Sequence, residues 1–329
     1  VRSRICFVRC HRFSYMSSPV PQPDETEAMH LSSSDGVIEP CLAAVSEDPW
    51  KLVRVAMGSL AAEPWRVKQA LLCPSEAFTL LPSAQISPYE SFQKTQSFDL
   101  FRQSAPFFPC ETNRTVDVII IGPLERLEEK VHVQKVCAHL EAFVGFRLVV
   151  RSQHLALGKW TQPRTGVDGN EQLAAQALLA EVQNLASPRS VCTVGLTAWD
   201  IYPPRMYDFV TGISNIAQRC AVYSTARYFY GKPTSRASIE PTSAAFVAAL
   251  CRECCKLCGI GECCLLRCLM NPFKGALPEH IREHPLNLCC ICLHKLQWIT
   301  QSDLLDRYAR LLGVTSEWFV DEALWLTDR

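Results

Sequence analysis

The chain has 329 residues, of which 48% are hydrophobic, and its 33 basic side chains balance 33 acidic ones. This length and composition suit one large domain or two modest ones with a buried core. Zero net charge argues against nucleic acid or an anionic membrane as the main partner. No apolar run approaches the length of a transmembrane helix, so we expect a soluble monomer.

The first fifteen residues are basic. Residues 1–15 contain four arginines and no acidic residue, a composition that is compatible with a mitochondrial transit peptide. The favoured interpretation is that the chain starts at Met16 and that the preceding residues are an artefact of the gene model. Residues 16–40 are rich in serine, proline and acidic side chains, so we expect no ordered structure there. Residues 1–40 are therefore interpreted as a disordered or mis-annotated tail.

The pattern of apolar residues divides the rest of the chain. Residues 41–115 contain short helical patterns interrupted by prolines, and we expect an extension packed on a main domain of residues 116–329. Four β-branched segments of that domain predict strands, at residues 116–124, 145–153, 190–203 and 219–230. Four segments have helical spacing, at residues 125–144, 170–186, 241–258 and 301–313. This order predicts an α/β fold in which helices pack over a mostly parallel sheet.

Polar residues and a glycine mark the ends of two of these helices. Asn170 is a possible N-cap of the helix over residues 170–186. Thr242 or Ser243 is placed to cap the helix over residues 241–258, and Gly259 is placed to end it.

Cysteines are numerous and clustered. The chain contains 18 of them, and ten lie between Cys251 and Cys292. A disulfide framework is typical of short secreted chains, whereas clustered cysteines in a longer chain suggest metal ligands and buried thiols. We therefore expect a reducing, intracellular environment, the cytoplasm rather than the mitochondrion.

Four of the clustered cysteines have zinc-ligand spacing. Cys263 and Cys268 form C-x4-C, and Cys289 and Cys292 form C-x2-C. Four thiolates complete the tetrahedral coordination of Zn²⁺ and leave no open position, which predicts a structural site. The alternative is a set of buried free thiols, but the paired spacings favour zinc.

Two other groups of residues are weaker candidates for metal binding. Cys251, Cys254, Cys255 and Cys258 recur along one stripe of the predicted helix, where Cys254 and Cys258 could supply two ligands. Cysteine is also a small buried hydrophobe, so a stripe facing the core is the favoured interpretation. His280 and His284 lie in H-I-R-E-H, which matches the inverted zincin motif, but short motifs often match by accident.

The cysteine framework, taken with Gly259 and Met270, resembles the archaemetzincins, a branch of the metzincin zinc proteases. That family carries H-E-x-x-H-x-x-G-x-x-H-C-x4-C-x-M, a spacer, and then C-x2-C. Glu253 falls on the catalytic glutamate, Gly259 on the motif glycine and Met270 on the Met-turn. The segments LTAWDIYP, AVYSTARY and HPLNLCCICLHKLQ also resemble the family, and the likeness covers residues 116–312. It implies a twisted, mostly parallel sheet with an antiparallel edge strand, an active-site helix and a zinc-stapled C-terminal segment.

The chain departs from the family at each catalytic zinc ligand. The three histidine positions hold Arg252, Lys256 and Glu262. Arginine stays protonated and has no lone pair to donate, and lysine could coordinate only as a neutral amine. Without a catalytic zinc, Glu253 has no metal-bound water to deprotonate. We expect these four side chains to form a charge-balanced cluster in place of the metal.

The resemblance also implies a way to bind peptides. Metzincins lay an extended substrate along an edge strand, and residues Cys220–Arg227 resemble that strand. An unpaired edge can hold a peptide or protein through main-chain hydrogen bonds, although an ordinary edge strand is an equally good interpretation. The first functional hypothesis is a pseudoprotease with one structural zinc. The alternatives are an active zinc aminopeptidase or endopeptidase with unconventional ligands, such as Glu262 with cysteines, and a purely structural zinc adaptor.

Overall fold

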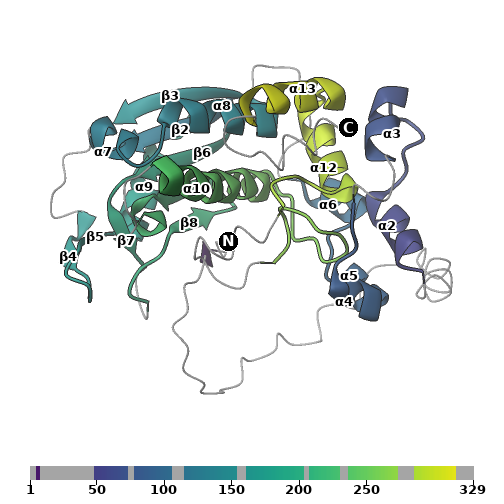
Figure 1. Cartoon of the computed structure of the whole chain (residues 1–329), viewed down its shortest axis with the longest axis horizontal. Coiled ribbons are helices and arrows are strands. Elements are labelled where there is room, and N and C mark those ends of the chain that lie inside the picture. Colours follow the sequence, from purple (N-terminus) through teal and green to yellow (C-terminus); the bar gives the residue numbers. More distant parts are fainter. Residues whose placement is uncertain are drawn as a thin grey trace.

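A six-stranded sheet forms the centre of the fold (Figure 1). The structure is a computed structural model that describes residues 5–7, 48–72, 78–105, 115–153, 161–203, 207–229, 236–272 and 285–315. The strands of this sheet, in spatial order, are β1 (Ile5–Phe7), β8 (Gly212–Asn215), β9 (Cys220–Ser224), β6 (Ser190–Thr197), β2 (Thr115–Ile121) and β3 (Arg147–Gln153).

The sheet is mostly parallel. Strand β2 pairs in parallel with β3 and with β6, and β6 pairs in parallel with β9. Strand β8 runs antiparallel to β9, and β1 runs antiparallel to β8. The predicted α/β class, with a mostly parallel sheet and an antiparallel strand at one side, is confirmed.

The alternation of side chains along β2 explains how the sheet is covered. Val118 and Ile120 belong to a core that they share with helices α8 (Val133–Val144) and α10 (Arg236–Leu257). Ile119 and Ile121 belong to a second core with α9 (Ala175–Leu185). Successive residues of a strand point to opposite faces, so both faces of β2 are buried under helices.

A small second sheet and a short helix adjoin the main sheet. Its strands are β4 (Arg164–Thr165), β5 (Glu171–Ala174) and β7 (Asp200–Tyr202), in that spatial order. The short 3-10 helix η4 (Ala226–Tyr228) follows β9.

Short helices precede the sheet, and two helices follow the cysteine-rich segment. The first group comprises α2 (Pro49–Met57), α3 (Trp65–Leu71), α4 (Pro82–Ile86), α5 (Pro88–Gln93) and α6 (Phe98–Ser104). The later pair is α12 (Cys290–Thr300) and α13 (Leu304–Thr315), against which α2, α3 and α6 pack. None of the described helices combines the length and the apolar character that a membrane span requires.

Several predicted boundaries are wrong. The helix predicted over residues 125–144 is two helices, α7 (Leu124–Glu128) and α8, separated by a turn. Residues Glu171–Ala174 form a strand, so α9 begins after Ala174 and Asn170 caps no helix. Helix α10 begins at Arg236, before the predicted caps, and continues through Pro241.

The first forty residues, where no ordered structure was expected, include strand β1. Its register places Ile5 opposite Asn215, Cys6 opposite Ser214 and Phe7 opposite Ile213. Strand β8 was not predicted either, because its four residues give too short a pattern to detect.

Strand β9 is not an edge strand, which corrects the expectation for residues Cys220–Arg227. It pairs with β6 on one side and with β8 on the other. Both sides of its backbone are therefore occupied over Cys220–Ser224, so a peptide cannot add to this strand. The antiparallel strands on this side of the sheet are β8 and, at the edge, β1.

Candidate metal centre

The cysteine-rich segment continues directly from the end of helix α10, and Gly259 turns the chain there. Gly259 has a φ of +88° and follows the last turn of the helix. Its N–H donates to the Lys256 carbonyl at 2.9 Å, and the Ile260 N–H donates to the Cys255 carbonyl at 3.0 Å. This is the Schellman arrangement, in which glycine adopts a left-handed conformation to end a helix. The predicted helix end at Gly259 is thus confirmed.

The four predicted zinc ligands come together. The Sγ atoms of Cys263, Cys268, Cys289 and Cys292 all lie within 4.8 Å of one another, and all four residues are buried. The Cys263 and Cys289 sulfurs are 3.7 Å apart. Tetrahedral thiolates with Zn–S bonds of about 2.3 Å lie about 3.8 Å apart, so this spacing fits zinc closely.

The electrostatics of the thiols also suit a cation. Hydrogen bonds from the thiols of Cys268, Cys289 and Cys292 hold the pKa of Cys263 well below its usual value. Burial raises the pKa of Cys289 well above its usual value. The group therefore stabilises one thiolate readily and further thiolates only with a cation among them, as Zn²⁺ supplies.

Asn271 is a central residue of this site that the sequence patterns did not single out. Its Nδ2 donates to the Cys263 carbonyl at 2.7 Å and to the Leu266 carbonyl at 2.8 Å. Its Oδ1 accepts from the Cys268 N–H at 2.8 Å. One buried amide thus links both cysteines of the C-x4-C pair. An asparagine directly after the Met-turn position was the available signal, because asparagine commonly bonds nearby backbone groups.

Backbone N–H groups support the sulfurs directly. The Cys268 sulfur accepts from the Met270 N–H at 3.4 Å and from the Cys289 N–H at 3.3 Å. Met270 is fully buried, and its carbonyl accepts from the Cys263 N–H at 3.1 Å. Hydrogen bonds of this kind orient metal ligands and tune their charge.

The turn between α5 and α6 forms hydrogen bonds to the same segment. Gln96 Oε1 accepts from the Gly261 N–H at 2.7 Å, and its Nε2 donates to the Gly259 carbonyl at 3.1 Å. The buried Lys295 ammonium donates to the Gln96 carbonyl and to its Oε1. Thr95 Oγ1 accepts from the Cys264 N–H at 2.9 Å. Segments far apart in sequence therefore fix the turn that leads into Cys263.

Two ion pairs involve the residues that the resemblance aligns with the family's catalytic zinc ligands. Arg252 Nη2 lies 3.6 Å from Glu262 Oε1 and donates to the Asn271 carbonyl at 3.3 Å. Lys256 Nζ lies 3.4 Å from Glu253 Oε2. The Arg252 and Glu253 side chains are buried, whereas the Glu262 side chain is 54% exposed. Each expected cation is thus paired with an expected carboxylate.

Tyr223 is a further residue at this position that sequence reasoning missed. Its hydroxyl donates to Glu253 Oε2 at 2.9 Å. Burial raises the pKa of Tyr223 well above its usual value, so the phenol stays a donor. Among the described residues, the other Glu253 oxygen has no hydrogen-bond partner. Tyr223 is the third residue of the strand pattern AVYS, where an aromatic residue is expected in any case.

The cysteine stripe of α10 faces the core. Cys251, Cys254, Cys255 and Cys258 are all buried in the main hydrophobic cluster. Burial raises the pKa of Cys251 and of Cys255 well above the usual value, which favours the neutral thiol over the metal-binding thiolate. The favoured interpretation of the stripe is confirmed. His280 and His284 lie outside the described residues.

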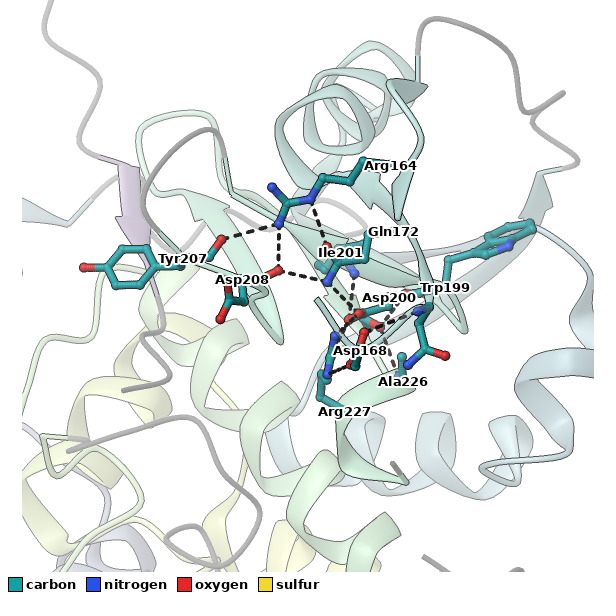
Figure 2. Close-up of polar contacts among 12 residues, drawn as sticks. Arg164, Asp168, Gln172, Trp199, Asp200, Ile201, Tyr207, Asp208, Ala226 and Arg227 are labelled. Carbon is teal, nitrogen blue, oxygen red and sulfur yellow. Dashed lines mark hydrogen bonds and ion pairs between the residues drawn. The ribbon is translucent and has the colours of Figure 1, made fainter. Parts of the chain in front are cut away.

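The far end of the predicted peptide-binding segment is engaged in the structure itself (Figure 2). Arg227 donates to Asp168 at 2.5 Å and, through two nitrogens, to Asp200. Its guanidinium carbon lies 4.0 Å from the centre of the Phe209 ring. Gln172 donates to the same Asp200 at 2.7 Å. This buried network fastens η4 to the small sheet and leaves Arg227 as a structural residue.

The fold and the site together define an α/β protein with a buried four-cysteine centre of the structural zinc type. Among its relatives, human archaemetzincin-1 is 28% identical over 242 residues, which cover 62% of this chain and 48% of the relative. Human archaemetzincin-2 is 30% identical over 179 residues, which cover 47% of this chain and 48% of the relative. Mouse archaemetzincin-1 is 32% identical over 181 residues.

Similarity to solved structures is lower. The crystal structure of archaemetzincin from Methanopyrus kandleri aligns with a TM-score of 0.43 and 21% identity, over 59% of this chain and 99% of that one. A zinc-dependent peptidase from Methanocorpusculum labreanum aligns with a TM-score of 0.43 and 16% identity. No protein-family model matches the chain.

The chain is similar in sequence to archaemetzincins, in agreement with the resemblance noted in its motifs. It spans about half the length of the curated human relatives that it matches. A buried group of four cysteines able to hold zinc is present.

Proposed function

We propose that this chain is a zinc-stabilised archaemetzincin relative that holds peptides without hydrolysing them. The observation that carries the proposal is the pairing at the three ligand positions. Arg252 pairs with Glu262, and Lys256 pairs with Glu253. A zinc ion at this position would meet two cations in place of two neutral imidazoles, which is strongly unfavourable.

The geometry of Glu253 supports the same conclusion. Its carboxylate accepts from the Tyr223 phenol and faces the Lys256 ammonium. A general base must reach the water that it activates, and this carboxylate is buried and engaged by two donors. Zinc therefore acts in this chain as a structural ion held by Cys263, Cys268, Cys289 and Cys292, supplying folding free energy rather than Lewis acidity.

A peptide-binding role is proposed for the side of β8 that faces away from β9, which β1 covers in the structure. Gly212 of β8 lies opposite Tyr223 of β9, and Tyr223 contacts Glu253. An extended segment that pairs with β8 would run past the position of the lost catalytic zinc. Main-chain hydrogen bonds along a strand do not depend on a metal, so this mode of binding is compatible with lost catalysis.

The proposal includes a reducing compartment, the cytoplasm, because the thiols of a structural zinc site must stay reduced to bind the metal. The proposal also includes a monomeric protein.

Hydrolysis assays with a chelator test the proposal. The purified full chain is incubated with a mixture of fluorogenic peptides, with and without o-phenanthroline, and its zinc content is measured in parallel. We expect one zinc per chain and no hydrolysis. Hydrolysis that the chelator abolishes, together with a second zinc, would establish instead an active peptidase with unconventional ligands such as Glu262 and cysteines.

A further inference from the structure

The chain supplies its own strand to the side of the sheet at which a peptide would bind. Strand β1 lies beside β8 at the border of the sheet, although more than two hundred positions separate them in sequence (Figure 1). The three residues of β1 pair antiparallel with three consecutive residues of β8. The other side of β8 is taken by β9, so β1 occupies the side that remains.

The register brings β1 close to the degenerate catalytic position. Phe7 lies opposite Ile213, and the neighbouring residue Gly212 lies opposite Tyr223 on the far side of β8. Tyr223 in turn donates to Glu253. The carboxyl end of β1 is thus the end nearest to the residues that replace the zinc site.

Gly212 of β8 leaves room for the Tyr223 ring. A Cβ atom at residue 212 would lie 2.8 Å from the Tyr223 ring, so glycine is required for the ring to lie over the strand. The Tyr223 ring therefore lies against the backbone of β8 and places its hydroxyl at Glu253. Strand β8, which pairs with β1, is therefore packed directly against Tyr223, which donates to Glu253.

Strand β1 is short, which indicates that another extended segment can displace it from β8. Three residues form few ladder hydrogen bonds, and each contributes little net stability. An unpaired edge is a template for any extended chain, and proteins commonly cover such edges. A short segment of the same chain covers the edge at a high effective concentration without binding it tightly.

We propose that residues Ile5–Phe7 act as an internal strand ligand that occupies the β8 edge and competes with an extended peptide for it. This inference rests on the proposed peptide-binding function and adds its regulation. Segments that bind in place of β1 would be extended, would present alternating backbone donors and acceptors, and would need no acidic or basic side chain for the pairing itself.

A cross-link in the full chain tests the pairing. Residues directly opposite each other in antiparallel strands have Cβ atoms about 5 Å apart. The variant Ser214→Cys places a cysteine opposite Cys6, and Asn215→Cys, one residue further on, is the matched control. After mild oxidation with glutathione disulfide, we expect peptide mass spectrometry to find a 6–214 disulfide and no 6–215 disulfide. Equal or absent cross-linking in both variants would overturn the inference.

Competition is tested with a fluorescent peptide, RSRISFVR, which copies residues 2–9 with serine at position 6. Its affinity is measured by anisotropy for the full chain, for a variant lacking residues 1–10, and for cross-linked Ser214→Cys. We expect about tenfold tighter binding to the truncated variant and weaker binding to the cross-linked one, with one zinc retained in each. Equal affinity for all three, or no binding to any, would overturn the inference. Hydrolysis of the probe would overturn the proposed loss of activity and leave the competition result standing.

Discussion

Two regions that are adjacent in sequence have opposite chemistry. The four-cysteine group begins at Cys263, and the last of the three catalytic ligand positions is Glu262, the residue before it. The cysteines present four soft donors within 4.8 Å of one another. The ligand positions present two cations that are each paired with a carboxylate.

Under the proposed function, the structural and the catalytic metal sites of one segment have diverged independently. Asn271 contacts both regions, because its side chain bonds Cys263 and Cys268 and its carbonyl accepts from Arg252. Loss of the cysteines is expected to unfold this segment. Replacement of zinc-binding histidines by ion-paired side chains is expected to change the free energy of unfolding only modestly. The proposal therefore predicts that the structural site persists where the catalytic one does not.

The largest expected effect is loss of the four-cysteine site. The double substitution Cys289→Ser with Cys292→Ser removes half of the ligands, and structural zinc contributes on the order of 10 kcal/mol to folding. We expect zinc content to fall from one per chain to near zero, and the cooperative thermal transition to disappear. Cys290→Ser is the matched control, since Cys290 lies between them and outside the four-sulfur group. Retained zinc in the double variant would contradict the assignment.

The substitution Asn271→Ala should have the next largest effect. It leaves two carbonyls and one N–H of the buried cysteine segment without their side-chain partner, which costs about 4 kcal/mol. Urea unfolding would measure the loss, and zinc transfer to a chromogenic chelator should accelerate. Asn271→Asp retains the acceptor for Cys268 and should fall between the two. An Asn271→Ala variant as stable as the wild type would show that this amide does not organise the site.

Acid sensitivity is expected to come from helix α8, which lies outside both regions. Burial, and then the charge of Arg307, lower the pKa of His139 to about 4 from an ordinary value of 6.5. Because the folded state disfavours the charged imidazole, the stability is complete above pH 6.5 and is lost as the pH falls towards 4, by about 3 kcal/mol. The variant His139→Asn should lack this component in urea titrations, whereas His132→Asn, at an exposed position before the same helix, should keep it. Equal pH profiles for all three proteins would exclude the effect.

The two ion pairs should differ from each other. Glu253→Ala removes a buried carboxylate from Lys256 and Tyr223, and we expect a loss of about 2 kcal/mol. Glu262→Ala removes an exposed carboxylate that lies 3.6 Å from Arg252, and we expect less than about 1 kcal/mol. Thermal unfolding measures both. A larger effect of Glu262→Ala would show that the outer pair, and not the inner one, holds this region together.

The sequence predicted the fold and the zinc ligands for identifiable reasons. Strands β2, β6 and β9 are buried and mostly apolar, and the paired spacing of four cysteines is typical of tetrahedral metal sites. The edge position was predicted for the wrong strand, because β8 has four residues and its pairing with β9 depends on contacts between distant segments. Gln96 and Tyr223 carry no local signal for their roles, which arise only when the fold brings Gln96 to the cysteine segment and Tyr223 to Glu253.

Zinc stoichiometry in a back-substituted protein tests the central claim most directly. The variant Arg252→His with Lys256→His and Glu262→His restores the three donors at positions whose side chains already converge, as the contact of 3.6 Å between Arg252 and Glu262 indicates. Elemental analysis should find one zinc per chain in the wild type and two in the triple variant. Two zincs in the wild type, or one in both proteins, would contradict the account that this chain kept the geometry of the catalytic position and lost its ligands.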